Sequence, residues 1–428
     1  MNERRRLLTE YIRDDADEEL DYLTIIPYGE DPLYVNKVAI YQPYMVTMTD
    51  GTEYRGDIWY SVDGGEWILY GGEFIDVPCF SKVRFKGNWH EIMKDIEYDM
   101  SNVSNIYTPY FYSQSSYDWW LLEGTPLSLI HGDNFKERKN DWNYMWDIFM
   151  GLFANNYAIS QVNNPKTFLP STELSAGCYY AMFAGSGIMN APELPAETLK
   201  EYCYYSMFEE CSRLEEAPAL NAKALMPYCY QGMFYNCYNL CYAKMTATDN
   251  FYETTVDGMF GYCAEYGLVM LSQELIDVGF AEYFFSNWTV ISEDYTTNEQ
   301  GYPESKGSIH DYTTACFNVP FIERVHDEYS DIYYNDFMLE ANKLGKELYD
   351  IITSWAVKWE INYMGGIFVN RHPILEVMWC EEDREDGTVD EWLQLKFRNA
   401  YGNYYGILDP DGTFWIYNHD YLLRDYIK

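Results

Sequence analysis

A Met-Phe pair that recurs at a nearly constant spacing restricts what this chain of 428 residues can fold into. The four pairs are Met182-Phe183, Met207-Phe208, Met233-Phe234 and Met259-Phe260. Successive pairs are 25, 26 and 26 residues apart, and an earlier degenerate unit ends in Leu152-Phe153. A fixed period of this length is typical of stacked structural repeats. We therefore expect a short solenoid in the middle of the chain.

Each unit repeats the same apolar pattern. In the clearest one, Cys203, Met207, Phe208, Cys211 and Leu214 stand at i, i+4, i+5, i+8 and i+11. This spacing predicts an apolar stripe on a short helical turn. Ala-Pro and Leu-Pro steps follow, and because proline cannot continue a helix they predict an extended return segment. One coil cannot bury its stripe alone, so we expect the coils to stack between atypical capping units.

The ten cysteines contain no CxxC pair, and most of them recur at repeat positions. The recurring ones are Cys178, Cys203 and Cys229 at one position, and Cys211, Cys237 and Cys263 at another; Ser186 replaces one member of the second series. A metal site would need four converging ligands. Stacked coils hold equivalent Cβ atoms about 5 Å apart in parallel directions, whereas a disulfide needs about 3.5–4.5 Å. We predict reduced, buried thiols that form a structural scaffold with the Met-Phe pairs.

The regions on either side of the repeats differ from them in pattern. Residues 26–120 show short strands with period-two alternation and predict a small antiparallel β-domain of sandwich type, because no helix-length apolar pattern could cover a single sheet. Residues 1–25 predict an N-terminal helix or arm. Residues 121–280 hold a connector and the repeats.

Residues 281–428 predict an α+β domain with an antiparallel sheet. An amphipathic helix is expected over 332–355, where six residues follow the helical period: Phe337, Ala341, Leu344, Leu348, Ile351 and Trp355. Strand-like runs follow at 357–363, 366–370, 374–380 and 392–399. The turn Asp409-Pro410-Asp411-Gly412 predicts a closing hairpin. The whole chain is thus expected to be an α+β multidomain protein.

The charge of the chain excludes some partners. With 68 acidic and 29 basic residues, the formal net charge is −39. Nucleic acid is disfavoured because affinity for phosphate comes mainly from Lys and Arg, and an anionic membrane would repel the chain. No run approaches the roughly 18 apolar residues of a membrane span. The start, MNERRRLLTEYIRDDADEEL, lacks the apolar stretch of a secretory signal. We therefore expect the chain to stay in the cytoplasm where it is made, or to leave by lysis inside a particle.

No constellation of residues typical of an enzyme is present in the sequence. The six histidines are scattered, and the spacings of zinc, phosphate-loop and serine-nucleophile motifs are missing. The triplet His131-Gly132-Asp133 lies in the connector, where a turn accounts for the glycine and the aspartate as well as a catalytic role would. Among 68 acidic residues some carboxylate pair always lies in range, so such a pair is not informative. We expect no catalytic residue, no cofactor and no metal.

One group of aromatic residues is a candidate binding surface. Its members are Tyr110, Phe111, Tyr112, Trp119 and Trp120. Aromatic rings in such runs serve either as a platform for sugars or as a packing seam. Here the seam would join the β-domain to the first repeat, and we favour that interpretation over the platform.

The repeat units, written CYYxMFxxCxxLxxAPxLPAxxL, closely resemble the BspA-like leucine-rich repeats of gut Bacteroidales and their phages, crAss-like phages of Bacteroides included. Residues 58–67 and 82–89 look like the small β-domain that often precedes such repeats, and 122–135 looks like the connector. The resemblance covers residues 35–275 and implies a binding or scaffold role without catalytic residues. Ser186 and the degeneration of the array after Cys241 depart from the family pattern.

These observations together predict a non-enzymatic structural or attachment protein of a phage virion: a head or tail decoration, a fibre or an adaptor. Its expected partners are other virion proteins and a host surface glycan or protein, with the chain a homo-oligomer within an assembly. A bacterial cell-surface adhesin is the alternative, and it would need an export route. A phage tail glycan depolymerase is a second alternative.

Overall fold

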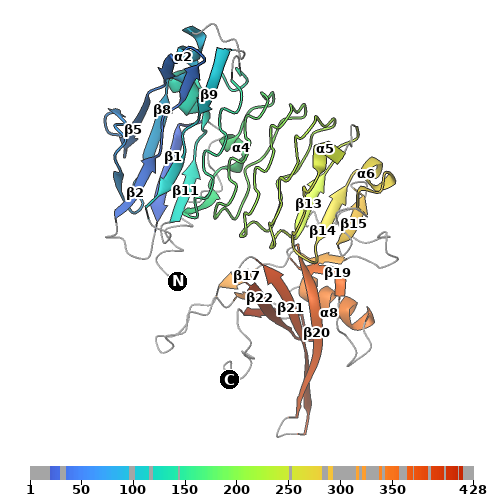
Figure 1. Cartoon of the computed structure of the whole chain (residues 1–428). Coiled ribbons are helices and arrows are strands. Elements are labelled where there is room, and N and C mark those ends of the chain that lie inside the picture. The colour runs from blue at the N-terminus through green and yellow to red at the C-terminus, as the bar shows by residue number, and fades with distance from the viewer. Residues whose placement is uncertain are drawn as a thin grey trace. The chain divides into compact units, whose positions relative to one another are not determined.

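The computed structural model describes most of the chain: residues 20–28, 35–95, 102–114, 119–142, 145–249, 253–281, 288–292, 315–317, 321–323, 337–339, 343–355, 364–369, 371–383, 387–399, 402–412 and 414–417. Residues 1–19 of the helix or arm expected at 1–25 lie outside these residues. The protein is mixed α+β, with several antiparallel sheets and few helices (Figure 1). Two compact units divide it. The larger one contains the first sheets as well as the repeats, lies within Leu7–Leu240 and Lys244–Cys263, and is called the repeat unit below. The C-terminal unit lies within Cys241–Ala243 and Ala264–Lys428.

Three sheets form the first part of the repeat unit. Their strand orders are β12-β11-β1-β8-β5-β6, β10-β2-β7 and β4-β3-β9. The strands are β1 (Leu23–Tyr28), β2 (Val35–Ile40), β3 (Met45–Met48), β4 (Glu53–Arg55), β5 (Ile58–Val62), β6 (Ile68–Leu69), β7 (Ile75–Pro78), β8 (Val83–Gly87), β9 (Val103–Tyr107), β10 (Phe111–Ser113), β11 (Trp119–Glu123) and β12 (Ile159–Val162). β11 and β12 are parallel, and the other pairings given for these sheets are antiparallel.

The sheets and the repeats share strands. The boundary predicted between residues 120 and 121 falls inside β11, and β12, which belongs to the first repeat, pairs with β11 in the same sheet. β1 begins at Leu23, inside the arm predicted for 1–25. Short helices cover this region: α2 (Trp89–Asp95), α3 (Leu127–His131), the 3-10 helix η2 (Gly132–Asn134) and α4 (Pro165–Phe168). The sheets are therefore continuous with the repeat array.

The repeats are built from consecutive turns, and the helical turn expected there is wrong. Left-handed φ angles recur at every fourth residue of a coil, as at Tyr202 (59°), Ser206 (49°) and Glu210 (60°). A positive φ interrupts a right-handed helix. The buried residues follow the same four-residue period, which over a short stretch matches the helical spacing i, i+4, i+8. Figure 1 shows the coils as parallel rungs in green.

Backbone hydrogen bonds alternate between two directions in these coils. The N–H of Met182 donates to the carbonyl of Tyr179 within the same coil, at 3.2 Å. The N–H groups of Tyr179 and Phe183 donate instead to Cys203 and Met207 of the next coil, at 3.0 and 2.9 Å. Neighbouring residues repeat this alternation. The buried backbone of a coil is thus satisfied only when the next coil is present.

The return segments of the coils are extended and buried at their ends. Leu174, Leu199 and Leu225 are buried there. Isolated parallel bridges join neighbouring segments, from Thr198 to Ala224 and from Ala224 to Asp249. The short helix α5 (Glu253–Val256) begins the last coil.

The C-terminal unit contains an eight-stranded sheet with the order β16-β19-β20-β21-β22-β23-β18-β17. A smaller sheet has the order β13-β14-β15. The elements are β13 (Tyr242–Met245), β14 (Leu268–Leu271), α6 (Gln273–Asp277), β15 (Thr289–Ser292), β16 (Ala315–Phe317), β17 (Phe321–Glu323), β18 (Phe337–Leu339), α8 (Lys343–Trp355), β19 (Met364–Val369), β20 (His372–Asp383), β21 (Val389–Asn399), β22 (Gly402–Leu408) and β23 (Phe414–Tyr417).

The helix expected at 332–355 is shorter than predicted. It begins at Lys343, and Phe337 lies instead in β18, which pairs with β23. Its apolar stripe, including Leu348 and Ile352, packs in one core with buried residues of the large sheet. The closing hairpin is confirmed, because β22 and β23 pair antiparallel across a turn in which the N–H of Gly412 donates to the carbonyl of Asp409.

Candidate functional site: a tyrosine-lined pocket

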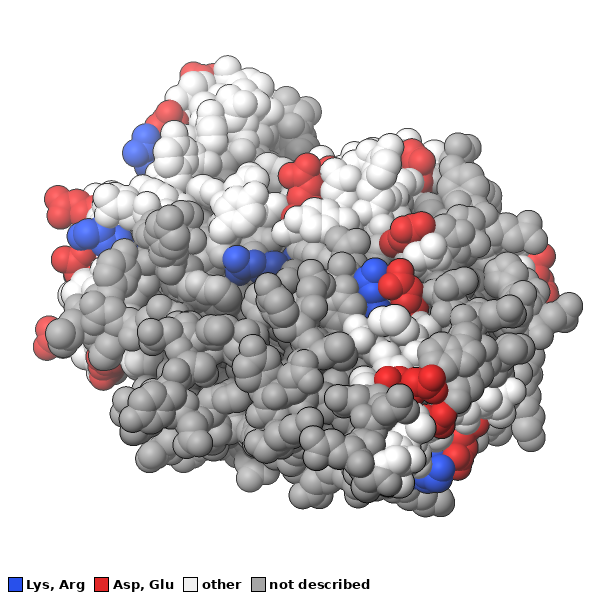
Figure 2. Space-filling model, turned by 90° about the horizontal axis from the view of Figure 1, so that it is seen from below, with Lys and Arg blue, Asp and Glu red and all other residues white. Residues whose placement is uncertain are grey.

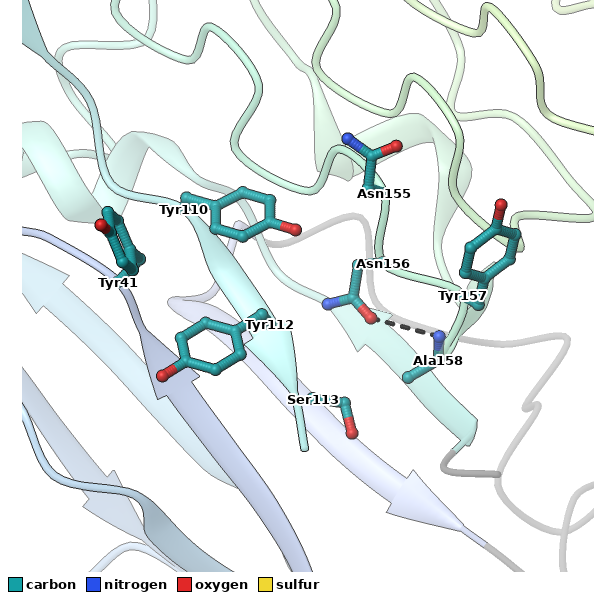
Figure 3. Close-up of a pocket in the computed structure, with 8 residues that line it drawn as sticks. All are labelled: Tyr41, Tyr110, Tyr112, Ser113, Asn155, Asn156, Tyr157 and Ala158. Carbon is teal, nitrogen blue, oxygen red and sulfur yellow. Dashed lines mark hydrogen bonds between the residues drawn. The ribbon is translucent and has the colours of Figure 1, made fainter. Parts of the chain in front are cut away.

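A pocket of about 320 Å³ lies in the repeat unit where the sheet β10-β2-β7 meets the first coil. Its lining residues are Tyr41, Tyr110, Tyr112, Ser113, Asn155, Asn156, Tyr157 and Ala158. Figure 3 shows the sheet tyrosines on one side and the asparagines with Tyr157 on the other. This volume is at the lower end of the range for small-ligand sites. It suits a short piece of a larger molecule.

Alternation along an extended segment separates the aromatic residues at the start of β10, which Tyr110 immediately precedes. Tyr110 and Tyr112 lie on the pocket side, with ring centroids 6.1 Å apart and planes 9° from parallel. Phe111 points to the opposite side, as expected for neighbours in a strand. Its ring is fully buried, and its centroid lies 4.9 Å from that of the Phe85 ring and 5.6 Å from that of the Phe153 ring. Two of the five predicted aromatic residues therefore line a pocket, and Phe111 packs the sheets on the first coil.

The two tryptophans of the predicted surface lie elsewhere. Trp120 is fully buried, and its backbone N–H donates to the carbonyl of Ala158 at 2.5 Å. Trp119 is half-buried, with its ring 6.0 Å from that of Tyr28 and 5.0 Å from the guanidinium carbon of Arg213. The expected surface of five aromatic residues is thus divided between a pocket and a packing seam.

Hydrogen bonds fix the frame of the pocket. The backbone N–H of Tyr41 donates to the carbonyl of Tyr110 at 2.9 Å. The side chain of Asn156 donates to the carbonyl of Phe111 at 3.0 Å and accepts from the N–H of Ala158 at 3.1 Å (Figure 3). Burial raises the pKa of Tyr110, so its phenol is neutral at physiological pH. These bonds hold the backbone around the pocket, whereas the side chains of Tyr41 and Tyr157 are 74% and 56% exposed.

Comparison of the chain with protein-family models, with curated proteins and with solved structures gives no match.

Sequence reasoning identified Tyr110 and Tyr112 and missed the other six lining residues of this pocket. Asn155 has a φ of +52° and occupies the left-handed position that Gly185, Glu210 and Asn236 hold in later coils. A four-residue period would have placed it at the end of the first coil. Tyr157 carries no such signal, because it comes after the periodic part of that coil.

The predicted scaffold residues lie inside the array. All of the Met-Phe pairs are buried. The phenylalanines form a continuous column with nearly parallel rings: Phe153, Phe183, Phe208, Phe234 and Phe260 are 5.4, 5.6, 5.7 and 5.4 Å apart. A second column, absent from the sequence prediction, consists of Phe149, Tyr179, Tyr204 and Tyr230. These side chains pack against one another and are not available to a ligand.

The recurring cysteines are free thiols, as are Cys79, Cys241 and Cys380. Those of the second series bond between coils: the Sγ of Cys211 donates to the carbonyl of Phe183 at 3.1 Å, and that of Cys237 to Phe208 at 2.9 Å. Cys263 donates to Phe234 at 3.4 Å and is half-buried. Cys178, Cys203 and Cys229 of the first series are buried. Burial raises the pKa of Cys211 to about 12, so the thiol stays protonated at neutral pH.

His131, the histidine of the connector, is buried among packing side chains. Desolvation by burial lowers the pKa of His131 to about 3, and the neighbouring His90, with its ring 5.0 Å away, acts in the same direction. The following Asp133 accepts hydrogen bonds from Tyr22 and Lys86. Among the described residues, no group of three His, Cys, Asp or Glu side chains is arranged to hold a metal ion.

Charged side chains are spread over the surface. On the face shown in Figure 2, the described Asp and Glu residues are scattered singly or in small groups, and the few Lys and Arg lie among them. No helix within the described ranges is long and apolar enough to cross a membrane. The pocket differs from this surface, because none of its eight lining residues is acidic or basic.

Proposed function

We propose that this chain is a non-enzymatic structural or attachment protein of a phage virion. The stacked coil array carries the proposal. Its recurring Cys, Met and Phe side chains pack inside the array, and its backbone bonds from coil to coil. Such an arrangement supports a rigid surface and leaves recognition to side chains outside the repeat pattern. The resemblance to BspA-like repeats of Bacteroidales phages points to the same role.

The same proposal covers the finer architecture. We assign the coils to a short leucine-rich-repeat solenoid, supported by the 25- and 26-residue period and the parallel bridges between return segments. The sheets before it form a sandwich-like domain, supported by the contact between Phe85 of β8 and Phe111 of β10, which belong to different sheets. Within a particle, the chain would be a homo-oligomer in contact with other virion proteins.

Mass spectrometry of purified particles tests the virion role. Phage should be banded on a density gradient, and the abundance of this chain compared with that of the major capsid protein across the fractions. We expect a constant ratio through the particle peak. A non-structural phage protein from the same lysate is the control and should stay at the top of the gradient. Absence of the chain from the particle peak would disprove the proposal, and its detection on uninfected cells would favour a bacterial adhesin.

A further inference from the structure

We propose that the tyrosine-lined pocket binds a neutral glycan. This inference rests on the proposed attachment role and adds to it the class of ligand. The residues that would contact the sugar come from three segments: Tyr41 after β2, Tyr110 just before β10 with Tyr112 in it, and Asn155 and Tyr157 at the end of the first coil. Segments far apart in the sequence thus converge on one concave place.

The tyrosine rings supply the apolar contact. Tyr110, immediately before β10, and Tyr112 within it present two nearly parallel rings on one side. The C–H groups on one face of a pyranose pack against aromatic faces, and Tyr offers such area at a small entropic cost because it has few rotatable bonds. The ring of Phe74 lies 5.6 Å from that of Tyr112 at 71°, an edge contact that helps to hold Tyr112 in place.

Polar groups around the rings suit hydroxyl ligands. Asn155 is exposed and offers both a donor and an acceptor, and Ser113 and the phenols offer hydroxyl groups. The phenol of Tyr110 points toward the first coil and its asparagines (Figure 3). A sugar packed on the tyrosine rings would direct the hydroxyl groups at the edge of its own ring toward the asparagine amides.

The negative charge of the protein disfavours anionic glycans in this pocket. The protein carries a formal net charge of −39, and the pocket lining contributes no cation to offset it. A sialylated, sulfated or phosphorylated glycan would enter against the field of the whole protein. A cationic ligand would find no carboxylate in the lining to pair with. A neutral glycan meets neither obstacle.

An extended peptide fits this place less well. β10 is an edge strand, and peptides bind edge strands through free backbone groups. Here the N–H of Phe111 donates to the carbonyl of Leu152, and its carbonyl accepts from the side chain of Asn156. The first coil therefore occupies the backbone positions that an added strand would need.

A glycan array read with the full chain tests the inference. The array should hold neutral gluco-, manno- and galacto-oligosaccharides, their sulfated and sialylated counterparts, and tyrosine- and proline-rich peptides. We expect binding to at least one neutral series, with a Kd of about 1 mM or tighter by calorimetry, and weaker binding of its charged counterpart. No neutral ligand, or preference for a peptide or an anionic glycan, would overturn the inference.

Substitutions then locate the site. Tyr41→Ala and Tyr157→Ala change exposed side chains, so the fold should persist, and each should weaken binding of the neutral glycan about tenfold. Tyr262→Ala is the matched control, since Tyr262 is 72% exposed and does not line the pocket. Equal affinity of all three variants and the parent would overturn the assignment to this pocket. Particles that contain the chain without glycan binding would refute this inference alone, and glycan binding by a chain absent from particles would refute only the virion role.

Discussion

The buried cysteines have a simple chemical consequence. Burial raises the pKa of Cys211 to about 12 and that of Cys203 and Cys237 well above the usual range, so the reactive thiolate is scarce. We predict that iodoacetamide at pH 8 leaves these three unmodified in the native protein and labels them after unfolding in guanidinium. Cys380, which is half-buried, should react faster and is the internal control. Rapid native labelling of Cys237 would contradict the described packing.

His131 should make the protein sensitive to acid. Its pKa is lowered to about 3 from an ordinary 6.5, mainly by burial, with His90 and Arg138 acting in the same direction and Asp141 opposing them. The folded state therefore binds fewer protons than the unfolded state between these values. The contribution of His131 to the free energy of unfolding is fully present above pH 6.5 and is lost as the pH drops toward 3. At pH 4 the loss is on the order of 3 kcal/mol.

A variant without the imidazole isolates this effect. His131→Phe removes the titration, so its unfolding free energy should fall less steeply between pH 6.5 and 4 than that of the parent, whatever its absolute stability. Urea unfolding at several pH values measures the two slopes. Parallel slopes would show that His131 is protonated as readily in the folded state as in the unfolded state.

Burial of single residues was predictable only where residue type and period agreed. Recurring Cys, Met and Phe have side chains that prefer the interior, and the structure buries the Met-Phe pairs completely or nearly so. Tyr179, Tyr204 and Tyr230 are buried as well, but a phenol is equally common at surfaces. The sequence groups Tyr110, Phe111 and Tyr112, but that Phe111 lies on the opposite side from its two neighbours depends on the short strand β10, which begins at Phe111.

At the scale of elements, the sequence predicts a helical turn where the coils have consecutive turns, because two periods coincide. Periods of 3.6 and 4 residues place nearly the same positions inward over one coil. Glycine at the left-handed positions would have separated them, and Gly177 and Gly185 do occupy such positions. Equivalent positions in the next coil hold Tyr202 and Glu210, which hide that signal. The β22–β23 hairpin was predictable because its turn residues are specific.

The left-handed positions allow a test of the turn structure. Gly232 has a φ of +61°, and an added Cβ would lie 3.0 Å from the Oγ of Ser206. Gly232→Ala should therefore destabilise the protein by about 1 kcal/mol. Ala181, with a φ of +48°, is the reverse case: Ala181→Gly relieves strain but gains flexibility when unfolded, so its net effect should be within about 0.5 kcal/mol. Thermal unfolding of both variants gives the comparison, and a helical coil would reverse their order.

The phenylalanine column should unfold as a connected element. Phe208 is fully buried between Phe183 and Phe234, at 5.6 and 5.7 Å. Phe208→Ala should lower the unfolding free energy by about 3–5 kcal/mol, because it leaves a cavity in the middle of the array. Phe208→Leu keeps most of the volume and should have a clearly smaller effect. Similar losses for both variants, measured by chemical denaturation, would argue against volume as the main contribution.

For the whole molecule, the acidic balance implies salt dependence. A formal net charge of −39 produces self-repulsion that favours the unfolded chain. Raising NaCl from about 50 mM to about 500 mM shortens the Debye length several-fold and should raise the Tm. Sucrose of matched osmolality is the control for general solute effects. A Tm that is constant or falls with salt would mean that specific ion pairs, such as Lys86–Asp133, outweigh the repulsion.

The division of the molecule was harder to predict than its elements. Period and composition separate repeats from strands, but they carry no information on strand pairing between distant segments. The pairing of β11 with β12 joins the first coil to the preceding sheet, so no boundary exists where composition changes.

The alternating backbone bonds give the array a direction. Each coil donates forward and accepts backward. The first coil has no preceding coil among the described residues to donate to it. Its carbonyls of Met150 and Leu152 accept instead from the hydroxyl of Thr108 and the N–H of Phe111, so the preceding sheets cap this end of the array. An extra copy of one 26-residue period between two inner coils would find the same donors, acceptors and ring neighbours as the original. We therefore expect that the array can be lengthened or shortened by whole coils, in evolution or by design, without changes to the sheets that begin it.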